Sequence, residues 1–265
     1  SNQAGANMGW SVASAGDVNG DGYSDIIVGA RNYDNGETDE GAAFVYHGSA
    51  SGINTTATAT LEINQASARM GESVASAGDV NGDGYSDIVI GAAGYHNGQT
   101  DEGAAFVYHG SASGISTTAA TTLESNQVRA FMGYSVASAG DINGDGYSDV
   151  IVGAYLYDNV ETNEGAAFIY YGSAIGVNST PAAKRESNQY GAYMGISVAN
   201  AGDVNGDGYS DVLMGAPFYN KGQDREGAAF VYYGNGGGGL RQNVQALDED
   251  LTNAYTTSGL CDASV

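Results

Sequence analysis

A repeat of 62 residues is the feature that most constrains the fold of this chain. The stretch DVNGDGYSD stands at 17–25, 79–87 and 203–211, and DINGDGYSD stands in the same phase at 141–149. No residue is inserted between copies. The flanking stretches keep the phase as well, because SVASAG or SVANAG precedes each copy and EGAAFVY or EGAAFIY follows it. A period of this length predicts one supersecondary unit that occurs four times.

Each unit contains four short segments with the character of β-strands. The first is SVASAG, the second is the β-branched run DIIVGA or a variant, and the third is GAAFVYHG, in which Phe44 and Tyr46 share one face. The fourth is weaker and reads TATLE at 58–62 and TTLE at 121–124. No window has a sustained 3.6-residue apolar period. We therefore predict an all-β fold, a β-propeller of four blades with four antiparallel strands each. A solenoid of hairpins is the alternative.

The repeat phase also predicts the domain boundaries. The four units cover about 1–62, 63–124, 125–186 and 187–250, so that the propeller occupies 1–250. In the last unit, VQALDED falls in the phase of a fourth strand and is reached through NGGGG at 235–239. The tail at 251–265 lies outside the repeat. It contains Cys261, the single cysteine, so no intrachain disulfide is possible.

The nine-residue loop carries three aspartates, one asparagine and two glycines. In the first copy the oxygens of Asp17, Asn19 and Asp21 alternate, Tyr23 can offer its backbone carbonyl, and Asp25 closes the set. Oxygen ligands at positions 1, 3, 5 and 7 follow the logic of a calcium loop, and a cation offsets the repulsion among the carboxylates. The lack of His and Cys argues against zinc and copper, while magnesium demands a tighter octahedron.

We therefore predict four structural Ca²⁺ sites, one in each unit, which tie the first strand of a blade to the second. Turns with solvated carboxylates are the alternative, although a turn alone does not need acids at positions 1, 5 and 9 of every copy. The predicted ligands occupy equivalent positions of the four copies: Asp17, Asn19, Asp21, Tyr23, Asp25, Asp79, Asn81, Asp83, Tyr85, Asp87, Asp141, Asn143, Asp145, Tyr147, Asp149, Asp203, Asn205, Asp207, Tyr209 and Asp211.

The charge balance limits the possible partners. Eight Lys and Arg against 31 Asp and Glu give a formal net charge of −23. A nucleic acid requires a basic face, so we expect no nucleic-acid partner. No run of 18 apolar residues is present, so we expect no membrane span.

Motifs that would indicate an enzyme are missing, and we predict that the chain is not one. No serine lies in a Gly-x-Ser-x-Gly context. His47 and His109 share a repeat phase with Tyr171 and Tyr233, which indicates packing at a strand end rather than catalysis.

A second polar loop precedes the third strand of each unit. It reads YDNGETDEG at 33–41, and its copies drift so that only the Glu before Gly persists. We interpret this Glu as a structural hydrogen-bonding residue, with a ligand surface as the alternative. The 19 tyrosines suit both strands and ligand contacts. Asn54 and Asn178 each begin a glycosylation sequon.

The stretch MGWSVASAGDVNGDGYSDIIVGA at 8–30 resembles the FG-GAP repeat of integrin α-subunit propellers and many bacterial surface proteins. Met-Gly replaces Phe-Gly in all four units, and Gly-Ala-Pro is complete only at 215–217. The resemblance covers about 1–234. It implies one Ca²⁺ in each loop, between the first and second strands of a blade. It also implies an extracellular or cell-surface setting, with a role in adhesion or ligand binding. Integrin-type propellers have seven blades, whereas this chain supplies four.

We therefore expect a non-enzymatic extracellular repeat protein with a structural or adhesive role. If four blades do not close into a ring, the first and last blades expose two different faces, and their contact is heterologous. The first expected partner is thus a second copy of the chain, in rings or filaments. The alternative is a monomeric recognition module that binds a glycan or protein ligand through loops on one face.

Overall fold

The computed structural model describes residues 3–236 and 240–247. These residues form sixteen strands in four antiparallel sheets and contain no helix, so none that could span a membrane. The strands are β1 (Met8–Gly16), β2 (Asp25–Ala30), β3 (Ala42–Tyr46), β4 (Ala59–Leu61), β5 (Met70–Gly78), β6 (Asp87–Ala92), β7 (Ala104–Tyr108), β8 (Thr121–Glu124), β9 (Met132–Gly140), β10 (Asp149–Ala154), β11 (Ala166–Tyr170), β12 (Ala183–Glu186), β13 (Ser197–Gly202), β14 (Asp211–Ala216), β15 (Ala228–Tyr233) and β16 (Arg241–Leu247).

Every sheet is a meander of four consecutive strands, and we call the four sheets blades 1 to 4. Blade 1 has the order β1-β2-β3-β4, and blades 2, 3 and 4 repeat this order with β5–β8, β9–β12 and β13–β16. The prediction of four antiparallel strands in each of four all-β units is therefore confirmed. Each strand is followed in the sequence by its neighbour in the sheet, because antiparallel strands can be joined by a loop without a crossover helix.

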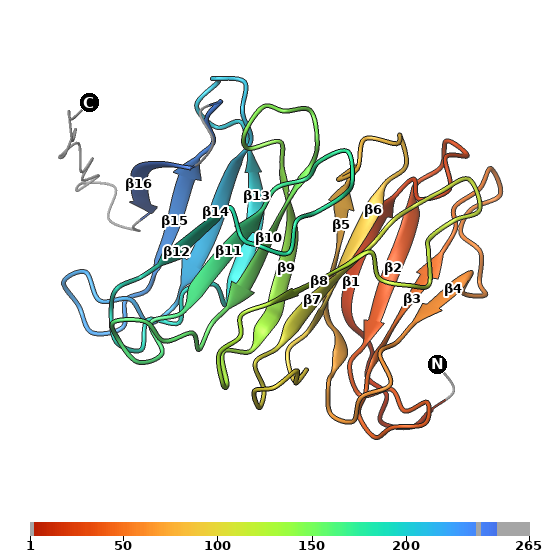
Figure 1. The fold of residues 1–265 in the computed structure, drawn as a ribbon, viewed down its shortest axis with the longest axis horizontal. Coiled ribbons are helices and arrows are strands. Elements are labelled where there is room, and N and C mark those ends of the chain that lie inside the picture. The colour runs from red at the N-terminus through yellow and green to blue at the C-terminus, as the bar shows by residue number, and fades with distance from the viewer. Residues whose placement is uncertain (1–2, 237–239, 248–265) are drawn as a thin grey trace.

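The blades are arranged around their first strands. The strand β1 packs beside β5, β5 beside β9, and β9 beside β13, and the sheets extend outward from this row (Figure 1). Blades 1 and 4 extend to opposite sides, so that β4 and β16 lie at opposite ends of the long axis. Among the described strands, β1 and β13 make no contact of comparable extent.

Small residues of the first and second strands allow the blades to approach closely. A Cβ atom added to Gly91 in β6 would collide with the backbone carbonyl of Gly133 in β9. Gly29 and Gly153 stand in the same relation to the blade that follows them. Any larger residue at these positions would push two sheets apart, so glycine is required by the packing.

The first strands are longer than the SVASAG segment predicts. Strand β1 begins at Met8 rather than Ser11, and its register with β2 shifts between these two residues. Gly9 lies in this irregular stretch with φ of 87°, a conformation that glycine adopts without strain. The extension brings Met8, Met70 and Met132 into the first strands of blades 1 to 3, which the β-pattern of the sequence did not predict, whereas β13 begins only at Ser197 and leaves Met194 outside it.

The last blade has a fourth strand, although its bounds differ from the predicted ones. Strand β16 covers Arg241–Leu247 and pairs with β15, whereas the expected segment was VQALDED at 244–250. Residues 248–250, the tail at 251–265 and Cys261 lie outside the described residues. Asn54 and Asn178 are both exposed, as a glycosylated asparagine must be.

Candidate metal centre

The nine-residue loop connects the first and second strands of each blade and is organised by its first aspartate. Asp17 accepts backbone N–H groups through both carboxylate oxygens: Gly20 donates to Oδ1 at 2.7 Å and Gly22 to Oδ2 at 2.8 Å. Asp21 completes this group, because its own N–H donates to Asp17 Oδ1 at 3.1 Å. A side chain that accepts several successive N–H groups holds the backbone in a tight turn.

The asparagine and the second aspartate bond to each other across the loop. Asn19 Nδ2 donates to Asp21 Oδ2 at 3.0 Å, and Asn19 Oδ1 accepts the N–H of Asp21 at 3.0 Å. Asp21 Oδ1 also accepts the N–H of Tyr23 at 3.0 Å. The same bonds recur in the other three loops within about 0.1 Å, as in blade 4, where Asn205 Nδ2 lies 3.0 Å from Asp207 Oδ2. The nine residues therefore fix the local geometry wherever they occur.

The last aspartate of the loop is a buried anchor. Asp25 is completely buried, accepts the N–H of Val18 at 2.9 Å through Oδ2, and accepts the N–H of Gly48 at 2.8 Å through Oδ1. It thereby joins the start of the loop to the segment that follows β3. The equivalent residues Asp87, Asp149 and Asp211 are also fully buried and make the same pair of bonds.

Burial and neighbouring acids make this anchor an unfavourable place for a negative charge. Burial raises the pKa of Asp149 to about 7, even though two backbone N–H donors act in the opposite direction. The charges of Asp145 and Asp141 raise this pKa further. In blade 2, burial raises the pKa of Asp87 to about 6, with a further contribution from Asp83. A cation beside the loop would relieve both effects.

The donor chemistry of the loop fits a hard cation. The predicted metal-ligating side chains in each loop are those of Asp and Asn. Their oxygen atoms suit Ca²⁺ better than they suit softer metals. The arrangement is that of a hydrogen-bonded turn: in the described residues, no group of three or more His, Cys, Asp and Glu side chains is placed to hold a metal ion. The twenty predicted ligands therefore remain a prediction that rests on their chemistry and on the electrostatics of the buried aspartate.

The tyrosine of the loop has a role that the sequence did not predict. Tyr85 lies over Gly20, the glycine in the preceding blade's loop, and a Cβ atom on Gly20 would come within 2.6 Å of the ring. Tyr147 and Tyr209 contact Gly82 and Gly144 in the same way. Each loop therefore packs against the next loop through an aromatic ring, and only Tyr23, at the start of the chain, is left 43% exposed. The recurrence of Tyr-Ser at positions 7 and 8 is the signal that could have indicated this contact.

The second polar loop behaves as the sequence predicts. Glu40, Glu102 and Glu164 are completely buried, and Oε1 of each accepts a backbone N–H from its own loop, donated by Asn35, Asn97 and Asn159. The fourth copy, Glu226, is exposed and accepts the N–H of Gln223 at 3.1 Å. The persistent glutamate is thus a structural residue of the loop.

The two histidines at the strand ends pack as expected. A Cβ atom added to Gly114 would lie 2.9 Å from the His47 ring, and one added to Gly176 would lie 2.8 Å from the His109 ring. Each glycine belongs to the following blade. The imidazoles therefore fill space between neighbouring blades.

The four sheets coincide with four matches to a family model. The FG-GAP repeat model matches residues 8–46, 70–108, 132–170 and 194–232, together more than half of the chain. Each match runs from the first residue of the Met-Gly pair to the third strand, which it covers to its end or, in blade 4, to its second-last residue, so it contains the whole of the candidate metal loop.

Several integrin α subunits are similar to the chain. Integrin alpha pat-2 of Caenorhabditis elegans is 34% identical over 228 residues, which are 79% of this chain and 18% of that protein. Human integrin alpha-6 is 34% identical over 192 residues, which are 72% of this chain and 16% of that protein. Integrin alpha-5 of Xenopus laevis is 32% identical over 180 residues, which are 64% and 17% of the two chains. The chain spans less than a fifth of the length of these relatives, and with four matched repeats it belongs to the FG-GAP repeat family.

Proposed function

We propose that the chain is a non-enzymatic, extracellular module with a structural or adhesive role, stabilised by four Ca²⁺ ions and assembled head to tail with further copies of itself. The observation that carries the proposal is the match between the two end faces. The outer face of blade 4 presents the groups that each earlier blade uses to receive the next one. The free face of blade 1 presents the groups that each later blade uses to join.

Neighbouring blades are joined by the same backbone hydrogen bonds at all three internal interfaces. The N–H of a loop serine donates to the first aspartate's carbonyl in the preceding loop at 2.9–3.0 Å, and the methionine of the Met-Gly pair donates to the carbonyl of the buried glutamate at 2.8–3.0 Å. The serine pairs are Ser86–Asp17, Ser148–Asp79 and Ser210–Asp141, and the methionine pairs are Met70–Glu40, Met132–Glu102 and Met194–Glu164.

The outer face of blade 4 lacks this cover among the described residues. Val204 is 54% exposed, whereas its counterparts Val18, Val80 and Ile142 are completely buried. A Cβ atom added to Gly206 would meet nothing within 4 Å, although each equivalent glycine of the earlier blades lies under a tyrosine ring. An apolar side chain beside an uncovered backbone is the kind of surface that marks an interface.

The free face of blade 1 is the counterpart. Val12 is 69% exposed, whereas Val74, Val136 and Val198 are 6–8% exposed at the equivalent place. Met8 and Ile26 are each 38% exposed, although their counterparts in the later blades are completely buried, and Tyr23 is 43% exposed where its counterparts are partly buried. Two copies in head-to-tail contact would bury these side chains as the internal interfaces do.

The apolar burial at the two faces is of the same order as the free-energy cost of association. Burying an aliphatic side chain fully contributes about 1.5–3 kcal/mol, and several such residues stand on the two faces together. Association costs roughly 4–15 kcal/mol in lost freedom of motion, so the apolar contacts alone leave little surplus. The repeated hydrogen bonds supply register and specificity. Because the two faces differ, the contact is heterologous and generates a ring if it closes or a filament if it does not.

Calcium supports both folding and assembly in this proposal. The internal interfaces bring each loop against the next through the tyrosine ring, so an interface between copies would bring two further acidic loops together. Four Ca²⁺ would neutralise eight of the 23 net negative charges. The remaining repulsion is screened by salt at physiological ionic strength.

The test is a mass measurement by light scattering in Ca²⁺ on the intact chain and two variants. Val12→Asp places a charge on the free face of blade 1, where the side chain is already exposed in the single chain, so folding is retained. Val160→Asp is the control. It makes the same change at a loop position of blade 3 that is 75% exposed and belongs to neither end face. We expect multiples of 26.9 kDa for the intact chain and for Val160→Asp, and a monomer for Val12→Asp. A monomeric intact chain at high concentration contradicts self-association.

A second candidate function, a recognition module, is favoured by a run of aromatic rings on blades 3 and 4. Phe131, Tyr134, Tyr155, Tyr193 and Phe218 contact one another with ring centroids 4.6–5.9 Å apart. The first four rings are partly exposed and Phe218 is 36% exposed. Aromatic surfaces of this kind bind sugars and protein side chains. Binding of the monomeric Val12→Asp variant to a glycan array would favour this function over a purely structural one.

A further inference from the structure

The interface between blades 3 and 4 differs from the two before it in the fourth strand of the repeat. Leu61 and Leu123 stand in the same phase on the fourth strands of blades 1 and 2, and both are buried against the next blade. In blade 3 this phase is taken by Arg185 on β12. The apolar partners across the interface are still present, since Phe230 and Tyr232 of β15 are 7% and 5% exposed.

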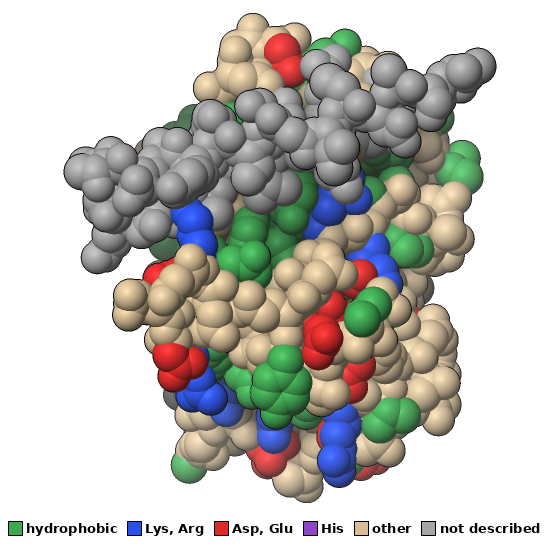
Figure 2. All heavy atoms as spheres, turned by 90° about the vertical axis from the view of Figure 1, so that its left-hand side faces the viewer, with side chains coloured by type: hydrophobic (Ala, Val, Ile, Leu, Met, Phe, Trp, Pro, Cys, Tyr) green, Lys and Arg blue, Asp and Glu red, His purple; other side chains and the backbone are tan. Residues whose placement is uncertain are grey.

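A cavity of about 590 Å³ lies at this place. It is lined by Lys184, Arg185, Glu186, Ser187, Asn188, Phe230, Tyr232 and Leu240. Its volume falls within the range of about 300–1,000 Å³ that is usual for small-molecule sites. Basic side chains are scarce in this chain, yet several lie on the side of the molecule that carries β15 and β16, around an area of hydrophobic side chains (Figure 2).

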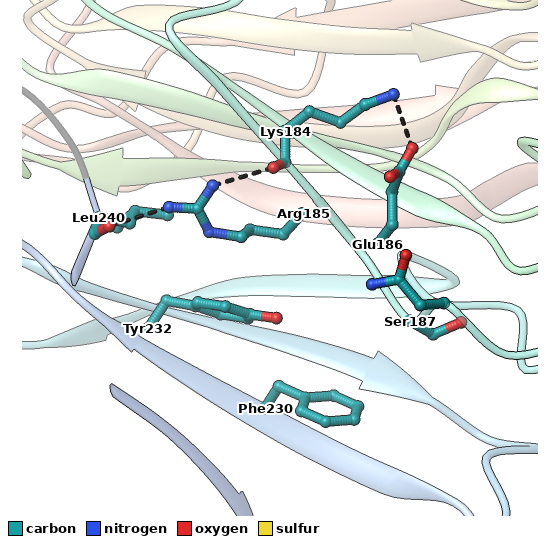
Figure 3. A pocket seen from close by; sticks show the side chains of 8 residues that line it. Lys184, Arg185, Glu186, Ser187, Phe230, Tyr232 and Leu240 are labelled. Atoms are coloured by element: carbon teal, nitrogen blue, oxygen red, sulfur yellow. Dashed lines mark hydrogen bonds and ion pairs between the residues drawn. The ribbon is translucent and has the colours of Figure 1, made fainter. Parts of the chain in front are cut away.

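Within the described part of the chain, Arg185 is the one charge of the cavity that has no counter-ion. Its Nη1 donates to the carbonyl of Lys184 and its Nη2 to the carbonyl of Leu240, both at 2.9 Å (Figure 3). Its Nε is buried and has no hydrogen-bond partner among the described residues, and no described carboxylate forms an ion pair with the guanidinium. A partly buried charge without an anion is unfavourable, so this group favours an anionic ligand.

The neighbouring charges cancel each other. Lys184 Nζ lies 2.6 Å from Glu186 Oε1, and Asn159 Nδ2 donates to Glu186 Oε2 at 3.1 Å. The lysine also contacts the ring of Tyr157, with Nζ 4.5 Å from its centroid. With this pair neutralised, Arg185 leaves the cavity with one net positive charge, which matches a monoanion better than a dianion.

The two rings define the body of the ligand. Tyr232 lies under the guanidinium, with Arg185 Cζ 5.5 Å from the ring centroid, and Phe230 lies beside it on the same strand (Figure 3). Burial raises the pKa of Tyr232 to about 12, so its hydroxyl stays neutral and adds no repulsion for an anion. Two aromatic walls stack on a flat ring in offset or edge-to-face geometry.

We propose that this cavity is a binding site for a small aromatic monocarboxylate. The carboxylate lies at Arg185, whose guanidinium supplies the positive charge, and the aromatic body lies along Phe230 and Tyr232. Guanidinium groups bind carboxylates in a planar, charge-assisted geometry that a lysine does not reproduce. The site is independent of the end faces and of the candidate metal loops, so it stands whether or not the chain assembles.

The probe for the test is benzoate, with benzamide as its neutral counterpart, measured by calorimetric titration against the full chain. We expect benzoate to bind with a Kd of about 1 mM or tighter and benzamide to bind at least about tenfold more weakly, because a hydrogen bond to a charged group is lost. If benzoate does not bind to the full chain, the proposal is overturned.

Three variants locate the site. Arg185→Leu introduces the residue that Leu61 and Leu123 provide in the same phase, so the fold accommodates it, and Arg185→Gln keeps the length of the side chain without the charge. Both should weaken benzoate binding at least about tenfold. Arg225→Leu removes the same charge near Phe218 and should leave binding unchanged. Equal benzoate affinity in Arg185→Leu, Arg185→Gln and the original chain would rule out this site.

Discussion

Blades 2 and 4 carry the same nine-residue loop, DVNGDGYSD, in different surroundings. Within the loop the two copies agree: Gly82 N lies 2.6 Å from Asp79 Oδ1, and Gly206 N lies 2.7 Å from Asp203 Oδ1. Outside it they differ. Val80 is completely buried and Val204 is 54% exposed, because only blade 2 is followed by another described blade. Sequence alone therefore sets the turn, whereas the neighbouring blade sets how much of the turn is buried.

Removal of calcium should have the largest effect on the free energy of unfolding, because it acts on the nine-residue loop that all four blades share. At about ten times a dissociation constant of about 10⁻⁴ to 10⁻³ M, each site adds about 1.4 kcal/mol to the free energy of unfolding. Four sites together add about 5–6 kcal/mol. Calorimetry with and without a chelator should show a clearly lower melting temperature in the chelator. An unchanged melting temperature means that the loops are stabilised by their hydrogen bonds alone.

An intermediate effect on the free energy of unfolding is expected from the valine of the loop, which is buried in blade 2 and half-exposed in blade 4. Val80→Ala removes buried methyl groups and should lower the free energy of unfolding by about 2 kcal/mol. Val204→Ala changes a half-exposed side chain and should cost less than about 0.5 kcal/mol. Denaturant titration at a protein concentration low enough to keep the chain monomeric measures both. Equal losses would mean that the outer face of blade 4 is covered in solution as blade 2 is.

The smallest expected effect separates the two acidic loops of one blade. Asp21→Ala removes a predicted Ca²⁺ ligand and should cost about 1.4 kcal/mol in saturating Ca²⁺, the contribution of one site. Glu37→Ala changes an exposed residue of the second loop and should stay within about 0.5 kcal/mol. The difference between the variants should shrink in a chelator. If calorimetry gives equal, small losses in Ca²⁺, Asp21 is not a metal ligand.

Much of the fold follows from the sequence because the repeat is strict. Four copies of the repeat in one phase predict four blades. The role of the persistent glutamate and the packing of the histidines also follow, because a residue that persists or alternates in one phase must suit the same surroundings in every blade.

Other features depend on contacts between units and could not be predicted from one unit. The ring of Tyr85 over Gly20 joins residues 65 positions apart, and neither residue is unusual within its own loop. The cavity at Arg185 lies where the repeat's leucine is replaced by arginine, and the consequence of that replacement depends on which residues face it across the interface. The arrangement of the loop carboxylates was also not predictable, since the first aspartate accepts backbone N–H groups of its own turn and the last one accepts an N–H from the segment after the third strand.

The order of the blades determines where local unfolding of the molecule should begin. All extensive contacts between blades, among the described strands, join blades that are adjacent in the sequence. Such an array behaves as a row of units coupled only to their nearest neighbours. Blades 2 and 3 have two neighbours and blades 1 and 4 have one, so amide hydrogen exchange should proceed from the two ends toward the middle. A second copy docked at an end would supply the missing neighbour and slow exchange in that blade first.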